Sequence, residues 1–332
     1  MRSEACALDV ENLSVTYGSG TGGVKAVDGV SLKVPKGEIV ALVGESGSGK
    51  TSLALGALGL LPGGCARTSG SARFEGEDLL RLGRGRLRRI LGRRIGIVFQ
   101  DAGQSLDPLF SCGYQIAESI RAHFAVSRTE LDHMVRELLE TMEVTPPDVR
   151  RRQLPDELSG GLKQRVCIAI ALSCEPSLII ADEPTSSVDS VTASRIVALL
   201  GVLNREKSLT VVVITHDLGL AERIAHRIVV MYCGRIVEAA PAKALLEAPL
   251  HPYTKALMEC RLPLTERLRR IPVVKGSLPK GDSLPGGCHF HPRCDVRDAQ
   301  CSEAAPPILE LPGERLVRCW KAGAANHVRS EG

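Results

Sequence analysis

The fold of this chain is decided by the stretch Gly44-Glu45-Ser46-Gly47-Ser48-Gly49-Lys50-Thr51. It follows an apolar run at 39–43 and opens a helix-prone run at 52–58, which is the strand–loop–helix setting of a phosphate-binding loop. Glycines let backbone N–H groups turn toward phosphate oxygens, and the helix N-terminus adds partial positive charge. We expect Lys50 to reach the β- and γ-phosphates and Thr51 to ligate Mg²⁺. The stretch therefore predicts an α/β nucleotide-binding fold, whose phosphate-binding residues are Gly44, Glu45, Ser46, Gly47, Ser48, Gly49, Lys50, Thr51 and Ser52.

A second stretch carries two carboxylates at the end of an apolar run, Leu178-Ile179-Ile180-Ala181-Asp182-Glu183. Four apolar residues before the acids indicate a buried parallel strand, and ligands of open α/β sheets bind at the carboxyl ends of such strands. Asp182 is expected to hold Mg²⁺ through its water shell, and Glu183 to orient and deprotonate the attacking water. A surface Asp-Glu pair at a strand end is the alternative.

The third stretch is Leu158-Ser159-Gly160-Gly161-Leu162-Lys163-Gln164-Arg165, which opens an apolar helix. A serine and two glycines at this position make a second anion-binding helix terminus. The stretch resembles the signature motif of ABC transporters, and the resemblance extends over about residues 8–260. It implies an ABC-type P-loop ATPase core with an antiparallel β subdomain and a helical subdomain.

The resemblance also assigns roles to residues that would mean little singly. Tyr17 matches the aromatic residue that stacks on the base, and Gln100 matches the sensor glutamine, which the resemblance makes a catalytic residue and a ligand of Mg²⁺. His216 matches the switch histidine, and Asp189 lies in the aspartate-containing loop. Two chains would face each other head to tail, so that each ATP also meets Ser159, Gly160 and Gly161 of the opposite chain.

Composition limits the class of partner. A chain of 332 residues with a net charge of +4 and 24% charged residues does not require a nucleic-acid partner. Its strongest basic cluster, at 81–94, indicates a solvated helix face, with a phosphate or acidic-lipid contact as the alternative. Neither an apolar run of about 18 residues nor an N-terminal signal pattern occurs. We therefore expect a peripheral protein on the cytoplasmic face of the inner (plasma) membrane, with other chains crossing it.

Periodicity gives the remaining elements. Residues 8–43 alternate apolar and polar positions with glycine breaks, which predicts an antiparallel sheet. Residues 111–150 place apolar residues at helical spacing, which predicts the helical subdomain. Residues 228–238 predict a hairpin that closes the ATPase core.

Two further stretches resemble oligopeptide and dipeptide importers. Gln104-Ser105-Leu106-Asp107-Pro108 is similar to their membrane-facing segment, although Ala102 replaces an expected proline. His251-Pro252-Tyr253-Thr254-Lys255-Ala256-Leu257 is similar to the start of their C-terminal extension, and a turn-rich segment follows at 276–287. We expect an ABC ATPase domain at 8–258 and an oligopeptide-transporter-type extension at 259–332.

Four of the eleven cysteines, Cys288, Cys294, Cys301 and Cys319, gather in that extension at spacings of six, seven and eighteen. Four thiolates can hold a [4Fe–4S] cluster or Zn²⁺, and the spacing does not separate these from a site without metal. His289 and His291 could complete a zinc site. The resemblance to the peptide-importer extension favours the iron–sulfur cluster.

The sequence thus predicts an ATP hydrolase that drives import of di- and oligopeptides. Its partners would be a second ABC ATPase subunit, identical or paralogous, two transmembrane permease subunits and, indirectly, a solute-binding protein. The same engine could import nickel, a metallophore or another small solute. A soluble ABC ATPase acting on nucleic acid is less compatible, because such proteins usually carry a second cassette or coiled-coil arms.

Overall fold

The computed structural model describes residues 6–18, 23–186, 188–260, 274–279 and 281–322. The described residues divide into two compact units. The first unit comprises residues 6–7, 34–39 and 81–214, and the second comprises residues 8–33, 40–80 and 215–322.

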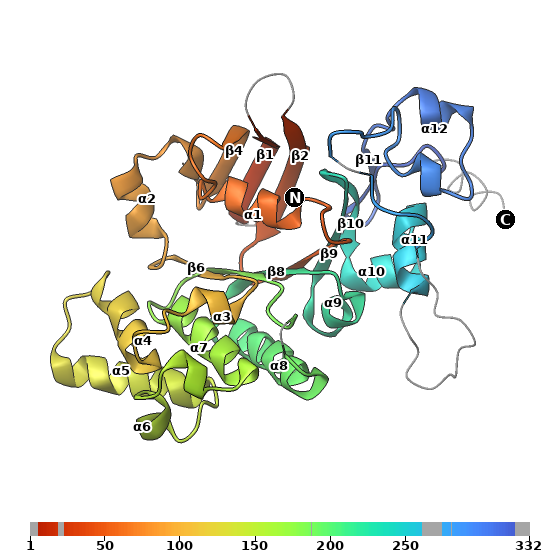
Figure 1. The fold of residues 1–332 in the computed structure, drawn as a ribbon. Helices are drawn as coiled ribbons and strands as arrows, with labels where there is room; N and C mark the ends of the chain where they lie inside the picture. Colours follow the sequence, from red (N-terminus) through yellow and green to blue (C-terminus); the bar gives the residue numbers. More distant parts are fainter. Residues whose placement is uncertain (1–5, 19–22, 187, 261–273, 280, 323–332) are drawn as a thin grey trace. The chain divides into compact units, whose positions relative to one another are not determined.

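The second unit contains the predicted antiparallel sheet. Its strands are β1 (Cys6–Tyr17), β2 (Val24–Pro35), β4 (Ala66–Phe74) and β5 (Glu77–Asp78), in the order β2-β1-β4-β5. Strand β4 runs antiparallel to both β1 and β5, so residues 66–78, which lie outside the stretch predicted for this sheet, belong to it as well. Helix α1 (Lys50–Ala57) lies beside these strands (Figure 1). A Cβ on Gly56 of this helix would lie 2.7 Å from Cγ2 of Val15, so the glycine permits the close packing of α1 on β1.

Strand β3 (Ile39–Val43) corrects one part of the expectation for residues 8–43. Residues 40–43 of β3 pair in parallel with β9 (Arg227–Tyr232), not in an antiparallel sheet. All five residues of β3 are buried, which is the pattern of a strand covered on both faces rather than one with a solvated face. Its short run of apolar residues does not alternate with polar ones, and such a run is typical of a buried parallel strand.

The hairpin predicted at 228–238 is confirmed, because β9 pairs antiparallel with β10 (Arg235–Pro241). The C-terminal extension adds β12 (Arg315–Val317) to β10 and β11 (Leu309–Leu311) to β12. Within the second unit the strands therefore follow the order β11-β12-β10-β9-β3. The extension continues the sheet that contains β3.

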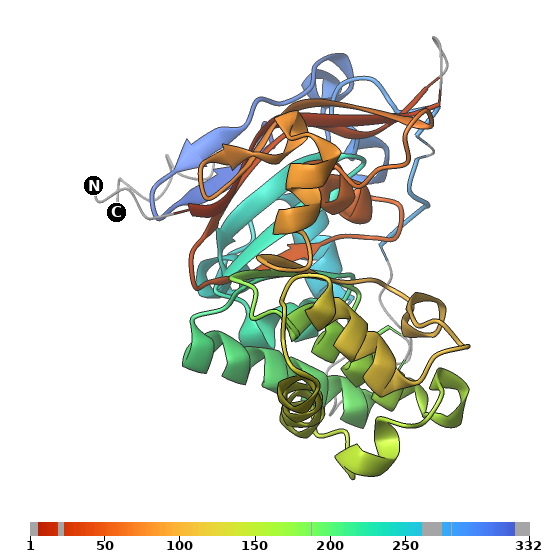
Figure 2. The same cartoon turned by 90° about the vertical axis from the view of Figure 1, so that its left-hand side faces the viewer.

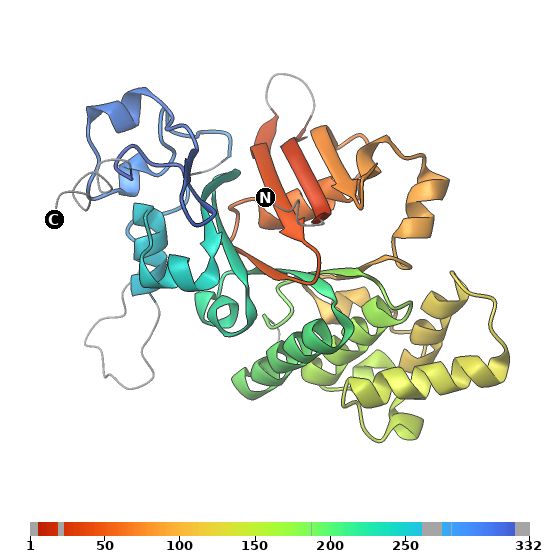
Figure 3. The same ribbon diagram turned by 180° about the vertical axis from the view of Figure 1, so that it is seen from behind.

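Short helices complete the second unit. They are η2 (Leu79–Arg81), α9 (Leu218–Ile224), α10 (Ala242–Glu247), α11 (Pro252–Glu259), η4 (His291–Arg293) and α12 (Ala299–Glu303). The last residue of η2, Arg81, belongs to the first unit. Figure 3 shows α10, α11 and the C-terminal segments beside β10. One hydrophobic core joins Val43 and Tyr232 of the strands, Tyr253 of α11, and Phe290 and Cys294 of the extension. Burial of apolar side chains thus attaches the extension to the unit that carries the phosphate loop.

The first unit combines parallel strands with the predicted helices. Strands β6 (Ile95–Val98), β7 (Leu178–Asp182) and β8 (Thr210–Thr215) follow the order β8-β7-β6, and β7 pairs in parallel with both neighbours. The helical elements are α2 (Arg84–Ile90), α3 (Ala102–Ser105), α4 (Cys112–Arg121), α5 (Arg128–Thr141), α6 (Pro147–Arg150), η3 (Pro155–Glu157), α7 (Gly160–Leu172) and α8 (Ser190–Lys207). In Figure 2, α4, α5 and α7 lie together.

The sequence of α5 shows why this part is helical. Ser127 and Glu130 form a capping box at its start, and the predicted apolar stripe places Leu131, Val135 and Leu139 in the interior. The arginines of α2 are exposed, in agreement with a solvated helix face. In the part of the chain that the structure describes, every helix is too short or too polar to cross a bilayer.

Candidate nucleotide site and cysteine pocket

The phosphate loop connects β3 to α1 within the second unit. Gly47 and Gly49 have φ angles of 85° and 101°, in the left-handed region that glycine adopts without strain. A Cβ on Gly49 would lie 2.3 Å from the carbonyl oxygen of Ala26, so only glycine fits there. The Lys50 side chain is buried and folded over the loop, where its Nζ donates to the carbonyl oxygens of Gly44 (2.8 Å) and Glu45 (3.0 Å). The loop thus has the backbone shape and the cation that a phosphate site requires.

Other predicted residues of the second unit lie around α1 or at a strand end. The Tyr17 hydroxyl donates to Oγ of Ser52, at 3.1 Å, which fixes the aromatic ring near the start of α1. Ser46, Gly47 and Thr51 are exposed, so the loop can be reached from solvent. His216 is exposed and directly follows the last residue of β8.

Glu45 makes contacts that the sequence did not predict. Its backbone N–H donates to the hydroxyl of Tyr253 (2.9 Å), and its carboxylate accepts two hydrogen bonds from Arg293, at 2.7 and 3.0 Å. Both partners come from stretches that resemble the peptide importers, one from α11 and one from the cysteine-rich segment. No periodicity or spacing links positions more than 200 residues apart, so only the fold could reveal these contacts.

The carboxylate-bearing edge belongs to the first unit. Asp182 ends β7 with a buried side chain, and Glu183 follows with a φ of 44°, a left-handed conformation that is uncommon for a non-glycine residue. The backbone N–H of Glu183 donates to the carbonyl of Ile214 (2.9 Å), and Nε2 of Gln100 donates to Oε2 of Glu183 (3.3 Å). The structure therefore brings the predicted base and the predicted sensor glutamine together. Left-handed non-glycine residues often occur at functional sites because the surrounding fold holds them there.

The signature stretch and the aspartate-containing loop also lie together in the first unit. Ser159 caps α7 by accepting a hydrogen bond from the N–H of Leu162 (3.4 Å), and Ser159 and Gly160 are exposed. A Cβ on Gly161 would lie 2.6 Å from Cγ2 of Thr192, whose hydroxyl donates to Asp189 (2.7 Å). Hydrogen bonds from the side chain and backbone of Thr192 lower the pKa of Asp189. The starts of α7 and α8 thus pack against each other. The side chains of Ser159 and Asp189, which are predicted to serve a second nucleotide, are exposed.

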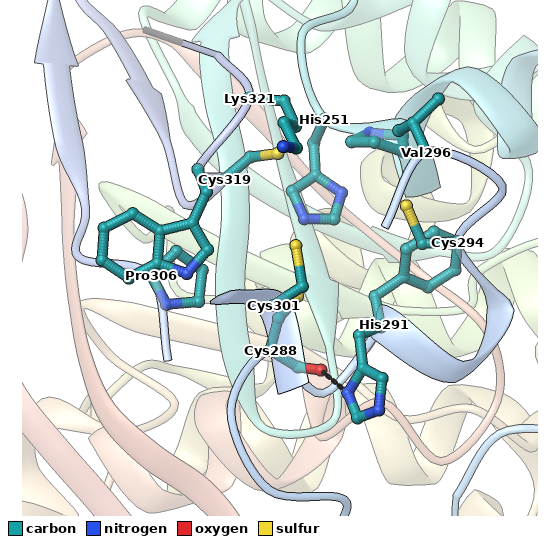
Figure 4. Close-up of a pocket in the computed structure, with 12 residues that line it drawn as sticks. His251, Cys288, His291, Cys294, Val296, Cys301, Pro306, Cys319 and Lys321 are labelled. Atoms are coloured by element: carbon teal, nitrogen blue, oxygen red, sulfur yellow. Dashed lines mark hydrogen bonds between the residues drawn. The ribbon is translucent and has the colours of Figure 1, made fainter. Parts of the chain in front are cut away.

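The four clustered cysteines line one pocket of the second unit, together with His251, Phe290 and Trp320 (Figure 4). Hydrogen bonds of the main chain hold the pocket together, since the N–H of Cys288 donates to the carbonyl of Cys301 (2.8 Å) and that of His291 to the carbonyl of Cys288 (2.9 Å). Strand β12, which leads into Cys319, pairs with β10. Cysteines that are up to 31 positions apart in the chain therefore converge through sheet pairing and loop hydrogen bonds.

The chemistry of this pocket suits soft metal ions, whereas its present geometry is not that of a metal site. All four cysteines are free thiols. Burial, followed by the charges of neighbouring cysteines, raises the pKa of Cys288 and Cys294. A cation would reverse this by favouring thiolates. Within the described residues, no group of three or more His, Cys, Asp or Glu side chains is arranged to hold a metal ion. The donor set fits a metal, and the side chains would have to turn to bind it.

The strand β3, the glycine loop and α1, together with an antiparallel sheet and a helical unit, define an ATP-binding cassette. Residues 27–186 match the ABC transporter family, and residues 237–301 match the family described as oligopeptide/dipeptide transporter, C-terminal region. A dimeric ATP-binding cassette solved in a post-hydrolysis state with ADP and Pi is similar in fold, with a TM-score of 0.64 and 31% identity over 71% of this chain and 98% of that one.

Curated relatives cover almost the whole chain. A Brucella melitensis protein named for peptide import is 42% identical over 94% of both chains. The dipeptide transport ATP-binding protein DppD of Haemophilus influenzae is 38% identical over 94% of both chains. The DppD of Escherichia coli is 36% identical over 94% of this chain and 95% of its own. This chain therefore belongs to the ABC ATPases of the oligopeptide/dipeptide transporter family.

Proposed function

We propose that this chain is the ATP-hydrolysing subunit that drives import of dipeptides or oligopeptides through separate membrane permease subunits. The observation that carries the proposal is the likeness to dipeptide transport ATP-binding proteins over 94% of the chain, which includes the C-terminal region characteristic of that family. Import of nickel or another solute has no comparable support, and neither does an action on nucleic acid.

ATP and Mg²⁺ are the expected ligands of an ABC ATPase. In the proposed site the N–H groups of the loop bind phosphate oxygens, and Lys50 exchanges its bonds to the loop carbonyls for bonds to the β- and γ-phosphates. Thr51, Gln100 and Asp182 would be the residues that hold Mg²⁺, which would neutralise charge on the phosphates. Glu183 accepts a proton from the attacking water, a role supported by its bond to Gln100 and its left-handed backbone. Tyr17 stacks on the base, and His216 contacts the γ-phosphate.

A second ATPase subunit completes each site in this proposal. Ser159, Gly160 and Gly161, with Asp189, serve the nucleotide bound by the opposite chain. The exposure of Ser159 and Gly160 and the dimeric state of a solved relative support this arrangement. Loss of the γ-phosphate on hydrolysis removes a shared ligand, so the two chains separate.

The proposed partners include two permease subunits and, through them, a solute-binding protein. The chain would work as a peripheral protein on the cytoplasmic face of the inner membrane. Next to the segment that resembles the membrane-facing region, Leu109 is 80% exposed, and the rings of Phe110 and Tyr114 stack at a centroid distance of 4.8 Å. Exposed apolar side chains of this kind suit a protein contact. The ATPase domain would occupy residues 8–258 and the extension residues 259–332.

For the pocket we propose a [4Fe–4S] cluster held by Cys288, Cys294, Cys301 and Cys319, with Zn²⁺ as the alternative. Four free thiols around one pocket are the donor set that such a cluster needs. When bound, the cluster would supply cross-linking of the extension. Protein purified without oxygen should be brown and contain about four irons and four sulfides per chain. Colourless protein with stoichiometric zinc would establish the alternative.

Transport itself tests the main proposal. The chain should be reconstituted in lipid vesicles with candidate permease and solute-binding proteins, and uptake of a radiolabelled dipeptide should be measured with ATP on the ATPase side. We expect uptake that requires ATP and is abolished by Lys50→Ala. ATP hydrolysis stimulated by nickel complexes but not by any peptide would reject the peptide assignment.

A further inference from the structure

Arg293 of the extension binds a residue of the phosphate loop. Its guanidinium meets the Glu45 carboxylate through two parallel hydrogen bonds, at 2.7 and 3.0 Å, the fork geometry that makes arginine–carboxylate pairs strong. The Arg293 side chain is 4% exposed, whereas that of Glu45 is 29% exposed. The arginine is nearly buried and the carboxylate is partly buried, so this pair differs from the fully exposed surface pairs that contribute little.

The remaining donors of Arg293 fix the guanidinium to its own segment. Nε donates to the carbonyl of Lys275 (2.7 Å), and Nη2 lies 3.3 Å from the carbonyl of Val274. The guanidinium carbon also lies 5.7 Å from the centre of the Tyr232 ring, within reach of a cation–π interaction. Burial acts to lower the pKa of Arg293, but hydrogen bonds to Glu45 and Tyr232 outweigh it and raise the pKa. The cation is permanently charged and preorganised, so Glu45 is drawn to one place.

Glu45 is in turn held at three points. Its carboxylate is bound by Arg293, its N–H donates to Tyr253, and its carbonyl accepts from Lys50 (3.0 Å). A separate contact lies two residues further along the loop, where a Cβ on Gly47 would be 3.3 Å from Cδ2 of Leu278. The segments around residues 253, 278 and 293 thus contact the loop at two separate places. All of these residues belong to the second unit.

We propose that Arg293 is a positioning residue of the nucleotide site, which holds Glu45 so that the loop keeps its phosphate-binding shape and the nearby carboxylate stays neutralised. Without it, the Glu45 carboxylate would be free to move, and its charge would oppose the triphosphate. Arg293 directly precedes Cys294, so the state of the cysteine pocket would reach the nucleotide site through one residue. This inference rests on the proposed nucleotide site.

The test measures the Kd of Mg-ATP and steady-state ATPase kinetics on the full-length chain. Arg293→Met should raise the Kd and the KM about tenfold, with kcat at saturating ATP changed much less. Arg293→Lys should recover part of the affinity, because it keeps the charge but loses the fork. The matched control is Lys275→Gln, which removes the exposed pair between Lys275 and Asp295 (2.9 Å) in the same segment and should leave the Kd unchanged.

A double-mutant cycle compares Arg293→Met, Glu45→Gln and the double variant with wild type. The double variant can be measured even if Arg293→Met folds poorly, because removing both charges leaves no buried ion unpaired. The effects of the two substitutions on Kd should be strongly non-multiplicative. Independent effects, or an unchanged Kd in Arg293→Met despite a lower Tm, would overturn the positioning role. A matching loss of affinity in Lys275→Gln would do the same.

Lys50→Ala distinguishes a failure of the Arg293 inference from a failure of the proposed nucleotide site. If Lys50→Ala binds ATP more weakly and Arg293→Met binds it with an unchanged Kd, this inference alone is rejected. Normal ATP affinity in Lys50→Ala would reject the nucleotide site and this inference with it.

Discussion

The phosphate loop and the cysteine pocket belong to the same unit and are built in opposite ways. The loop uses eight consecutive residues, and the groups proposed to bind phosphate are mainly its backbone N–H groups, which glycine allows to turn inward. The four cysteines of the pocket come from positions 288 to 319, and they line one pocket because β12 joins β10 and Phe290 enters the core. Local geometry specifies the first site, and packing specifies the second. Substitutions at the nucleotide site should therefore mainly lower ATP binding and hydrolysis, whereas substitutions in the pocket should mainly lower the stability of the fold.

The largest effect should come from Glu183, the proposed catalytic base. Glu183→Gln should lower the turnover of ATP at least about a hundredfold and leave ATP binding largely intact, because it removes the proton acceptor but no phosphate ligand. Single-turnover hydrolysis and equilibrium binding of ATP measure the two quantities. The matched control is Lys50→Ala, which should weaken binding itself. Near-normal hydrolysis by Glu183→Gln would remove this carboxylate from its role.

Mixed dimers test whether the loop works with a second chain. Lys50→Ala and Ser159→Arg should each be inactive alone, whereas a mixed dimer should gather both lesions in one site and leave the other intact. Random mixing should restore about a quarter of wild-type ATPase activity, since half of the dimers are mixed and each has one working site. Activity is measured against the mixing ratio, with dimer formation checked by light scattering. Mixed dimers that form and stay inactive would contradict the head-to-tail arrangement or show that the two sites work only together.

The pocket should respond through stability more than through chemistry. Cys288→Ser should abolish the bound iron and lower the Tm by several degrees, while retaining ATP binding that depends on Lys50. Iron content, thermal unfolding and the Kd of ATP are compared with those of Cys65→Ser, whose cysteine is exposed and lies outside the pocket. Full iron content in Cys288→Ser would remove it from the ligand set. A loss of ATP affinity as large as that of Lys50→Ala would erase the contrast between the two sites.

The smallest effect concerns His251 beside the pocket. This buried side chain caps α11 by accepting a hydrogen bond from the N–H of Tyr253 (3.0 Å), and burial lowers its pKa to about 3. The unfolded chain takes up the proton below about pH 6.5, whereas the folded chain stays neutral until about pH 3. Stability should therefore fall by about 1.4 kcal/mol for each pH unit below 6.5.

His251→Asn should remove this part of the pH dependence, because asparagine keeps a cap acceptor and does not titrate. Urea unfolding at several pH values between 7.5 and 5 measures the slope. The same slope in wild type and variant would contradict the assignment.

Sequence reasoning succeeded wherever neighbours in the chain act together. The glycine loop, the two carboxylates at the end of β7 and the hairpin at 228–238 were located because each signal lies within about a dozen residues. The one error in the strands, the antiparallel assignment of residues 39–43, arose because a buried strand shows no alternation and its partner is nearly 190 residues away. Pairing direction is a property of the partner as much as of the strand.

By itself, the sequence determined the phosphate loop, the acids, the signature helix and the family, because dihedral preferences and apolar periodicity are properties of short segments. Only the tertiary structure decided that Arg293 binds Glu45, that Leu278 lies beside Gly47 and that four cysteines share a pocket. These contacts join residues far apart in the chain. Their existence depends on how the sheet and the core bring the C-terminal segments back to the loop, which no local pattern encodes.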